Sequence, residues 1–142
     1  MSAPARAALD AAMTEKDLRV TVPFPPKDLN PNVQRRQHWA QRAKVARDYR
    51  YQVKVDTKNA MNRLRLRGPL PTPVRLSVLF LCKDRRKRDY DNLLAMLKPA
   101  LDGLVDAGLL EDDDTDHLEF GELRVLKGQD ASAVELTFGA PR

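Results

Sequence analysis

The chain has 142 residues, of which 42% are hydrophobic and 32% are charged, and its formal net charge is +5. This length supports one hydrophobic core and excludes two domains of ordinary size. No apolar run approaches the roughly 20 residues that a membrane-spanning helix needs, so no membrane partner is expected. The single cysteine, Cys82, excludes an internal disulfide and indicates a reducing compartment. With only two histidines and one cysteine, a zinc site is not expected.

The charge is unevenly distributed along the chain. Residues 1–88 contain 21 Lys and Arg and 7 Asp and Glu, a net charge of +14, whereas residues 89–142 contain 4 and 13, a net charge of −9. A basic half suits a nucleic-acid partner, because cationic side chains displace the counterions of the phosphate backbone. An acidic half would repel that partner unless metal ions occupied part of it, which favours a catalytic protein over one that only binds.

The N-terminal half predicts an extension, a strand and a long helix. Residues 1–17 are expected to be a flexible extension to a single domain at 18–142. Residues 18–24 alternate apolar and polar side chains, as a half-buried strand does, and a proline-rich loop follows. Residues 33–63 contain no Gly or Pro and repeat apolar side chains at helical spacing, which predicts one long amphipathic helix. Trp39, near its start, is interpreted as a core anchor rather than a base-stacking residue.

The middle of the chain predicts a buried strand and a second helix. Residues 74–82 are dense in Val, Leu and Phe and are expected to be central in the sheet. Leucines recur at helical spacing from residue 93, and Gly108 is a natural stop for this helix. Pro99 lies inside it, which predicts either a kink or two short helices that meet at Lys98.

Two alternating segments, 117–126 and 132–138, follow and are predicted to pair as a hairpin across the turn between them. The expected order is strand, long helix, strand, helix, strand, strand. This order predicts a single domain of α/β or α+β class, with a mixed sheet packed against helices.

A basic run directly precedes two aspartates at the junction between the predicted central strand and the second helix. Asp89 and Asp91 are two residues apart, so in extended backbone both carboxylates can face one ion. Hard oxygen ligands hold Mg²⁺ or Mn²⁺, while cations neutralise phosphates, so the pairing suggests a nuclease. The alternatives are a solvated loop and, for Asp91, a simple helix N-cap. The basic residues of this run are Lys83, Arg85, Arg86, Lys87 and Arg88.

An acidic turn, residues 111–116, offers further carboxylates. It is not an EF-hand, because His117 stands where the loop needs glycine and Leu123 where it needs a bidentate glutamate. Its carboxylates would reach Asp89 and Asp91 if the chain after Gly108 folded back to the start of the central strand.

The pattern Arg-Asp-x-Asp-Asn at 88–92, a helix of about four turns, and Ala-Gly-x-x-x-Asp-Asp at 107–113 together resemble the RusA family of Holliday junction resolvases. The opening PFPPKDLNPNVQRRQHW, 23–39, also resembles that of phage-borne and prophage-borne members. The resemblance spans residues 18–138. It implies a homodimeric endonuclease of the bacterial cytoplasm that acts in DNA recombination and repair. Such an enzyme uses Mg²⁺, or Mn²⁺ in its place, and cuts two opposing strands of a four-way DNA junction.

The resemblance also implies roles for individual residues. Asp89, Asp91 and Asp113 match the three metal carboxylates, with Asp112 the alternative for the third. From its position alone, Asn92 could either cap the helix or orient a metal ligand through a hydrogen bond. The family's catalytic lysine lies in the intervening helix, where Lys98 is the only lysine. Lys98 follows Asp91 by seven residues, against about one turn in the family's shorter form, and two turns return it to the same helix face. Phosphate contacts are assigned to Arg85, Arg86, Lys87 and Arg88, with Arg35 and Arg36 as second choices.

Two other functions fit the same residues. A nucleic-acid-binding protein without catalysis would use the aspartates as caps and solvated turn residues, and it would bind equally well without Mg²⁺. A related nuclease of flaps or replication forks would share the aspartates but would not need a four-way substrate.

Overall fold

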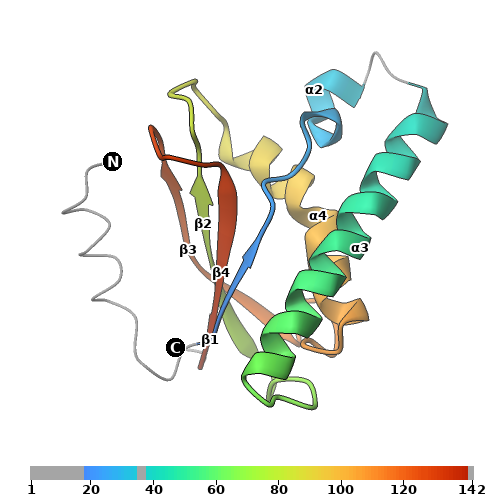
Figure 1. Ribbon diagram of the computed structural model, residues 1–142, viewed down its shortest axis with the longest axis vertical. Coiled ribbons are helices and arrows are strands. Elements are labelled where there is room, and N and C mark those ends of the chain that lie inside the picture. The colour runs from blue at the N-terminus through green and yellow to red at the C-terminus, as the bar shows by residue number, and fades with distance from the viewer. Residues whose placement is uncertain (1–17, 35–37, 141–142) are drawn as a thin grey trace.

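A four-stranded sheet with two long helices packed on one of its faces forms the body of the molecule (Figure 1). The computed structural model describes residues 18–34 and 38–140. The predicted extension at 1–17 lies outside these residues. The elements in chain order are β1 (Leu18–Val22), the 3₁₀ turn η1 (Lys27–Leu29), α2 (Pro31–Gln34), α3 (Trp39–Arg63), β2 (Val74–Leu81), α4 (Tyr90–Asp106), β3 (Leu118–Leu126) and β4 (Ala133–Gly139). The fold is a single α+β domain with a mixed sheet, as predicted.

The strand order β1-β4-β2-β3 corrects the predicted hairpin. β3 pairs parallel with β2, while β4 pairs antiparallel with both β2 and β1, so β3 and β4 lie on opposite sides of β2. The chain after β3 crosses the end of β2, where Gln129 N donates to Cys82 O at 3.0 Å. Alternation identified both strands correctly but carries no information about partners. β2 is the strand most buried on both faces, so it takes a neighbour on each edge.

The predicted long helix is α2 and α3 in the structure, with residues 35–37 outside the described range. His38 is the N-cap of α3, and its Nδ1 accepts a hydrogen bond from Ala40 N at 3.2 Å. Burial along α3 begins only at Tyr49 and continues through Val53 to Met61. Trp39 is 68% exposed, so the interpretation as a core anchor is wrong. In the first turns of α3 only Val45 and Ala46 pack against the core, each partly buried, and Trp39 lies before them.

α4 is one helix of 17 residues that continues through Pro99. Neither a break at Lys98 nor a second short helix is present there. α4 buries a stripe of leucines against α3 and the sheet, including Leu97 and Leu104. No helix in the described part of the chain combines the length and apolarity required to traverse a bilayer.

Candidate active site

One arginine of the basic loop after β2 is half-buried, while its other cations face solvent. The Arg88 side chain is only 15% exposed, and it pairs with Asp84 at 2.9 Å. Its guanidinium also lies over the Phe24 ring, 5.7 Å from the centroid. Hydrogen bonds and ion pairs to Arg88 and Arg86 hold the pKa of Asp84 well below its usual range. Arg88 therefore braces the loop, whereas Arg86, with its side chain 79% exposed, faces solvent.

Asp89 and Asp91 lie where this loop enters α4. Asp89 is the N-cap residue, with extended backbone (φ −98°, ψ 137°), and its side chain makes no capping hydrogen bond. Asp91 is already in the first helical turn. The predicted extended alternation of the two residues is therefore wrong, and so is the alternative in which Asp91 is the N-cap. Both carboxylates remain at the positive end of the helix dipole, which favours anionic groups.

A groove of about 480 Å³ opens in front of Asp89. One wall belongs to the loop and the start of α4, and the other to the segment after β1. Sequence reasoning missed the second wall, although it lies within the motif that opens the resemblance. Polar residues line both walls: Asp84, Arg86, Lys87, Arg88, Asp89 and Asn92 on the first and Lys27, Asn30 and Asn32 on the second, with Ser132 beside them. Arg35 and Arg36 lie outside the described residues.

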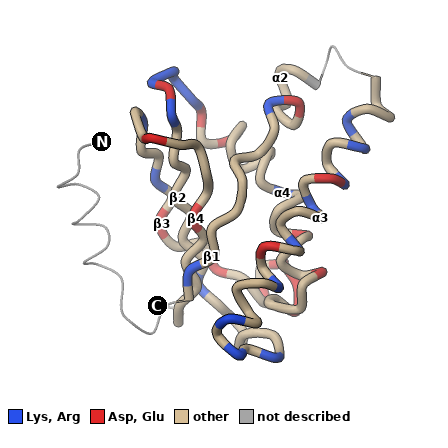
Figure 2. Tube along the Cα trace, viewed as in Figure 1, with Lys and Arg blue, Asp and Glu red and all other residues tan. Residues whose placement is uncertain are grey.

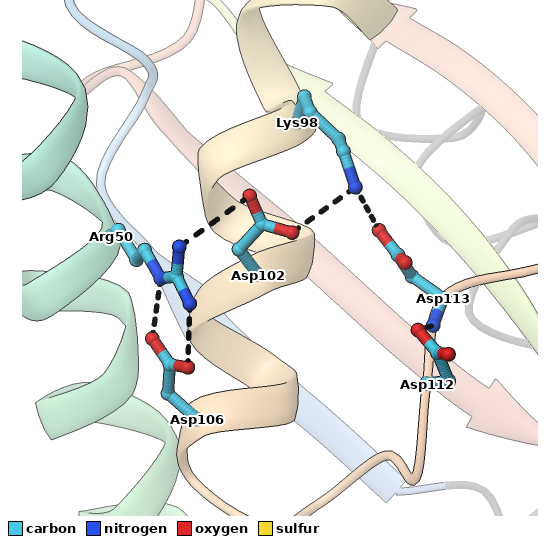
Figure 3. Close-up of polar contacts among 6 residues, drawn as sticks. All are labelled: Arg50, Lys98, Asp102, Asp106, Asp112 and Asp113. Atoms are coloured by element: carbon cyan, nitrogen blue, oxygen red, sulfur yellow. Dashed lines mark hydrogen bonds and ion pairs between the residues drawn. The ribbon is translucent and has the colours of Figure 1, made fainter. Parts of the chain in front are cut away.

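The acidic turn meets α4 at Lys98 (Figure 3). The Lys98 ammonium forms an ion pair with Asp113 and a second one with Asp102, at 3.1 Å. The hydrogen bond from Lys98 lowers the pKa of Asp113, and the same bond raises the pKa of Lys98. The Lys98 side chain extends toward Asp102, one turn further along α4, where it pairs with both carboxylates.

Arg50 of α3 completes a row of alternating charges along α4 (Figure 3). Its guanidinium donates to both carboxylate oxygens of Asp106, at 2.5 and 2.8 Å, and lies 3.9 Å from Asp102. The hydrogen bond with Arg50 lowers the pKa of Asp106. Asp102 thus lies between two cations, Arg50 and Lys98. No local sequence pattern links Arg50 to Asp106, because they lie on different helices, whereas Lys98 and Asp102 are an i,i+4 pair within α4 that sequence reasoning overlooked.

Asp89, Asp91 and Asp113 do not form a group whose ligand atoms all lie within 4.8 Å of one another. The chain does fold back after Gly108, since Val74 N donates to His117 O at 3.0 Å. That contact is at the start of β2, however, whereas Asp89 and Asp91 follow its end. Asp91 and Lys98 are seven positions apart in α4, a rise of about 10 Å, and Asp113 forms an ion pair with the Lys98 ammonium.

One group of possible metal ligands is compact among the described residues: Asp112, Asp114 and His117, whose ligand atoms all lie within 4.8 Å of one another. His117 Nδ1 lies 2.5 Å from Asp114 Oδ1, and this contact raises the pKa of His117 and lowers that of Asp114. Asp112 also accepts a hydrogen bond from Asp113 N at 2.7 Å. Asp112, the alternative third ligand, is thus in this group, and His117 was missed as a candidate.

Figure 2 shows the two kinds of charge in different places. Lys and Arg gather at the loop beyond β2 and along α3, and Asp and Glu gather at the end of α4 and in the turn after it. The two kinds of charge meet between α3 and α4, where Arg50 pairs with Asp102 and Asp106.

Comparison with known proteins found two relatives, while no family model matches. An uncharacterised protein of Xylella fastidiosa is 36% identical over 94 residues, which are 66% of this chain and 59% of that protein. The chain therefore matches less than two thirds of that relative's length. The crossover junction endodeoxyribonuclease RusA of Enterobacteria phage HK97 is 30% identical over 114 residues, which are 79% of this chain and 83% of the phage protein. With most of both chains aligned, this chain belongs to the RusA family.

Proposed function

We propose that the protein is a metal-dependent endonuclease that binds four-way DNA junctions and resolves them by paired, symmetric nicks. The observation that carries this proposal is the 30% identity to the phage HK97 crossover junction endodeoxyribonuclease across 83% of that protein. The site adds support, because acidic and basic side chains occupy one groove at the start of α4. A homodimer is part of the proposal, since a symmetric substrate favours a symmetric enzyme.

Asp89, Asp91 and Asp113 would hold Mg²⁺ or Mn²⁺, with Asp112 as the alternative to Asp113. Their chemistry fits, since all are carboxylate oxygens, the ligands that hard divalent cations prefer. The Asp89 carboxylate makes no capping hydrogen bond to α4, and the Asp113 carboxylate forms an ion pair with the ammonium of Lys98. When bound, the ion would supply Lewis-acid activation of water and neutralise charge on the phosphate.

The Lys and Arg side chains near the site would have different roles. Arg85, Arg86 and Lys87 are exposed on the loop beside Asp89, and they would contact the DNA backbone. Arg88, which is turned inward onto Asp84 and Phe24, would instead hold that loop in shape. Lys98 would stabilise negative charge on the scissile phosphate, and Asp102 would keep its ammonium on the side of α4 that faces Asp113. Asn92, half-buried in the same groove, would orient a ligand.

The test is cleavage of a labelled mobile four-way junction with Mg²⁺, beside linear duplex, flap and fork substrates. We expect paired nicks at the junction alone, and their loss in both Asp113→Asn and Asp91→Asn. The Asp91→Asn variant should bind junctions as tightly as the wild type or more tightly, because it removes a negative charge that faces phosphate.

Other outcomes separate the competing functions. Tight binding without any cut would indicate a protein that only binds DNA, and cuts confined to flaps or forks would indicate the related nuclease. Loss of binding together with cleavage in Asp91→Asn would make that aspartate structural.

A further inference from the structure

Trp39 is the largest apolar side chain of the protein, and the fold places it in solvent. It is 68% exposed at the first residue of α3. Its indole stacks on the His38 imidazole, with ring centroids 5.9 Å apart and 27° between the planes. His38 is itself fixed by the hydrogen bond from Ala40 N to its Nδ1. The indole is therefore backed by a second ring while much of its surface stays open.

Trp39 borders a pocket of about 410 Å³ between the start of α3 and the middle of α4. This volume is within the range of small-molecule sites, roughly 300–1,000 Å³. Arg42 and Lys98 supply positive charge to the pocket, and Lys98 is also the ion-pair partner of Asp113. The other lining residues are mainly apolar: Leu29, Ala43, Ala46, Ala95 and Pro99. The pocket therefore adjoins the candidate catalytic lysine.

The charge around the pocket indicates its occupant. α3 carries seven Lys and Arg and two Asp, a net charge of +5 over 25 residues. The blue positions along α3 in Figure 2 show this basic helix. An apolar pocket with an aromatic rim on a basic helix matches a nucleotide, which has a flat π-face and an anionic backbone.

We propose that Trp39 is a stacking platform for a DNA base that has left the duplex stack, with Arg42 beside the backbone of the same strand. This proposal deepens the proposed function and rests on it for its substrate, since a four-way junction has bases at its branch point that can unstack. Bases inside a linear duplex are already stacked on both faces and offer no free face to an indole. Trp39 would thus favour branched and single-stranded DNA over duplex without reading sequence.

Fluorescence gives a direct test, because Trp39 is the single tryptophan of the chain. The full chain is titrated with a four-way junction, a linear duplex of equal length and a single-stranded oligonucleotide, in buffer with EDTA so that nothing is cut. We expect strong quenching of Trp39 by the junction and by single-stranded DNA, and little by the duplex. A junction carrying 2-aminopurine at the branch point should lose 2-aminopurine fluorescence in the same titration.

Substitutions then measure what the stacking contributes. Trp39→Ala should weaken junction binding about 5- to 150-fold, the loss that removing one base-stacking aromatic causes, and change duplex binding less than about twofold. Trp39→Phe should keep most of the affinity. Tyr51→Ala is the matched control, because Tyr51 is a similarly exposed aromatic of α3, at 65%, outside this pocket. It should leave junction affinity within about twofold.

Three results would overturn the proposal: unchanged junction affinity in Trp39→Ala, an equal loss for junction and duplex, or a change in molar mass by light scattering. The last would mean that the exposed indole is a contact between subunits. Thermal melting of Trp39→Ala should match the wild type, which excludes a folding defect as the cause. If the wild type cuts no junction but single-stranded DNA still quenches Trp39, the stacking site stands and the proposed function fails.

Discussion

At the scale of single residues, Tyr49 shows how a polar group is accommodated in this core. The side chain is buried in α3, and its hydroxyl donates to Pro23 O at 2.6 Å, joining the helix to the end of β1. Burial, with a smaller contribution from Asp56, raises the pKa of Tyr49 well above its usual value. The folded state therefore strongly favours the protonated phenol.

We predict that Tyr49→Phe lowers the free energy of unfolding at pH 7 by about 0.5–1.5 kcal/mol, the net value of one hydrogen bond. Because the folded pKa lies above the unfolded one, near 10, the stability due to the protonated phenol is complete below about pH 10. It is lost as the pH rises further, so the difference between wild type and variant should shrink. Urea unfolding at pH 7 and at about pH 10.5 measures it. Tyr51→Phe, at an exposed site, should be neutral at pH 7, and a Tyr49→Phe difference that is equal at both pH values would contradict the assignment.

At the scale of elements, the close approach of α3 and α4 determines the shape of the site. A methyl group on Gly103 of α4 would lie 2.6 Å from Arg50 O and 3.0 Å from Val53 Cβ, both in α3. The two backbones therefore pack directly against each other at this position. The same contact region places Arg50 against Asp106 and within 3.9 Å of Asp102.

Gly103→Ala should therefore destabilise the protein by about 1–3 kcal/mol, although alanine has the better helix propensity by about 1 kcal/mol. The overpacked backbone contact outweighs the propensity gain. Gly68→Ala is the control, because a methyl group there meets nothing within 4 Å, and it should be neutral or slightly stabilising. Thermal melting of both variants gives the comparison. Equal stability of Gly103→Ala and wild type would mean that the helices separate at little cost.

Local patterns predicted the elements well and their partners poorly. Strands β1 and β2 and helix α4 were located to within a few residues, because alternation and leucine spacing are local signals. The hairpin prediction failed because pairing depends on which strand can be buried on both edges. Trp39 was misplaced for a related reason: helical spacing identifies a face, but not how far the core extends along it.

In the candidate site, too, the features that are local in the sequence could be predicted and the contacts between distant residues could not. The basic loop and the two aspartates at the start of α4 could be located from sequence, since they adjoin one another along the chain. The ion pairs of Lys98 with Asp113 and of Arg50 with Asp106 could not, because they join residues 15 and 56 positions apart. The second wall of the groove, with Lys27 and Asn32, depends in the same way on the path of the chain after β1.

At the scale of the whole molecule, Lys and Arg are concentrated in the loop beyond β2 and along α3, and Asp and Glu at the end of α4 and in the turn after it (Figure 2). A DNA backbone would meet the basic side, and cations displaced there make binding depend on salt. Arg86 and Arg88 stand near each other in sequence but differ in this role, because one faces solvent and the other is folded against Phe24.

We predict that Arg86→Ala weakens junction binding and lowers the slope of log affinity against log salt by about one. Arg88→Ala should instead lower the melting temperature, since it removes the shorter of the two ion pairs of Asp84 and the contact with Phe24. Binding measured between about 50 and 200 mM salt, with melting curves for both variants, separates the two roles. An unchanged slope in Arg86→Ala would remove that side chain from the DNA contact.

Because α4 is one continuous helix between Asp91 and Lys98, the number of residues between them fixes the angle between their side-chain directions. Each helical residue turns the side-chain direction by about 100°, so an interval of seven residues ends roughly 20° short of two full turns. An interval of four residues ends about 40° past one turn, close to the same direction. Inserting or deleting about one turn of α4 here would thus move Lys98 along the axis yet keep it on the same side. A change of one or two residues would rotate Lys98 away from the side of α4 that carries Asp91, so we expect length changes between these two residues to be tolerated best in steps of a turn.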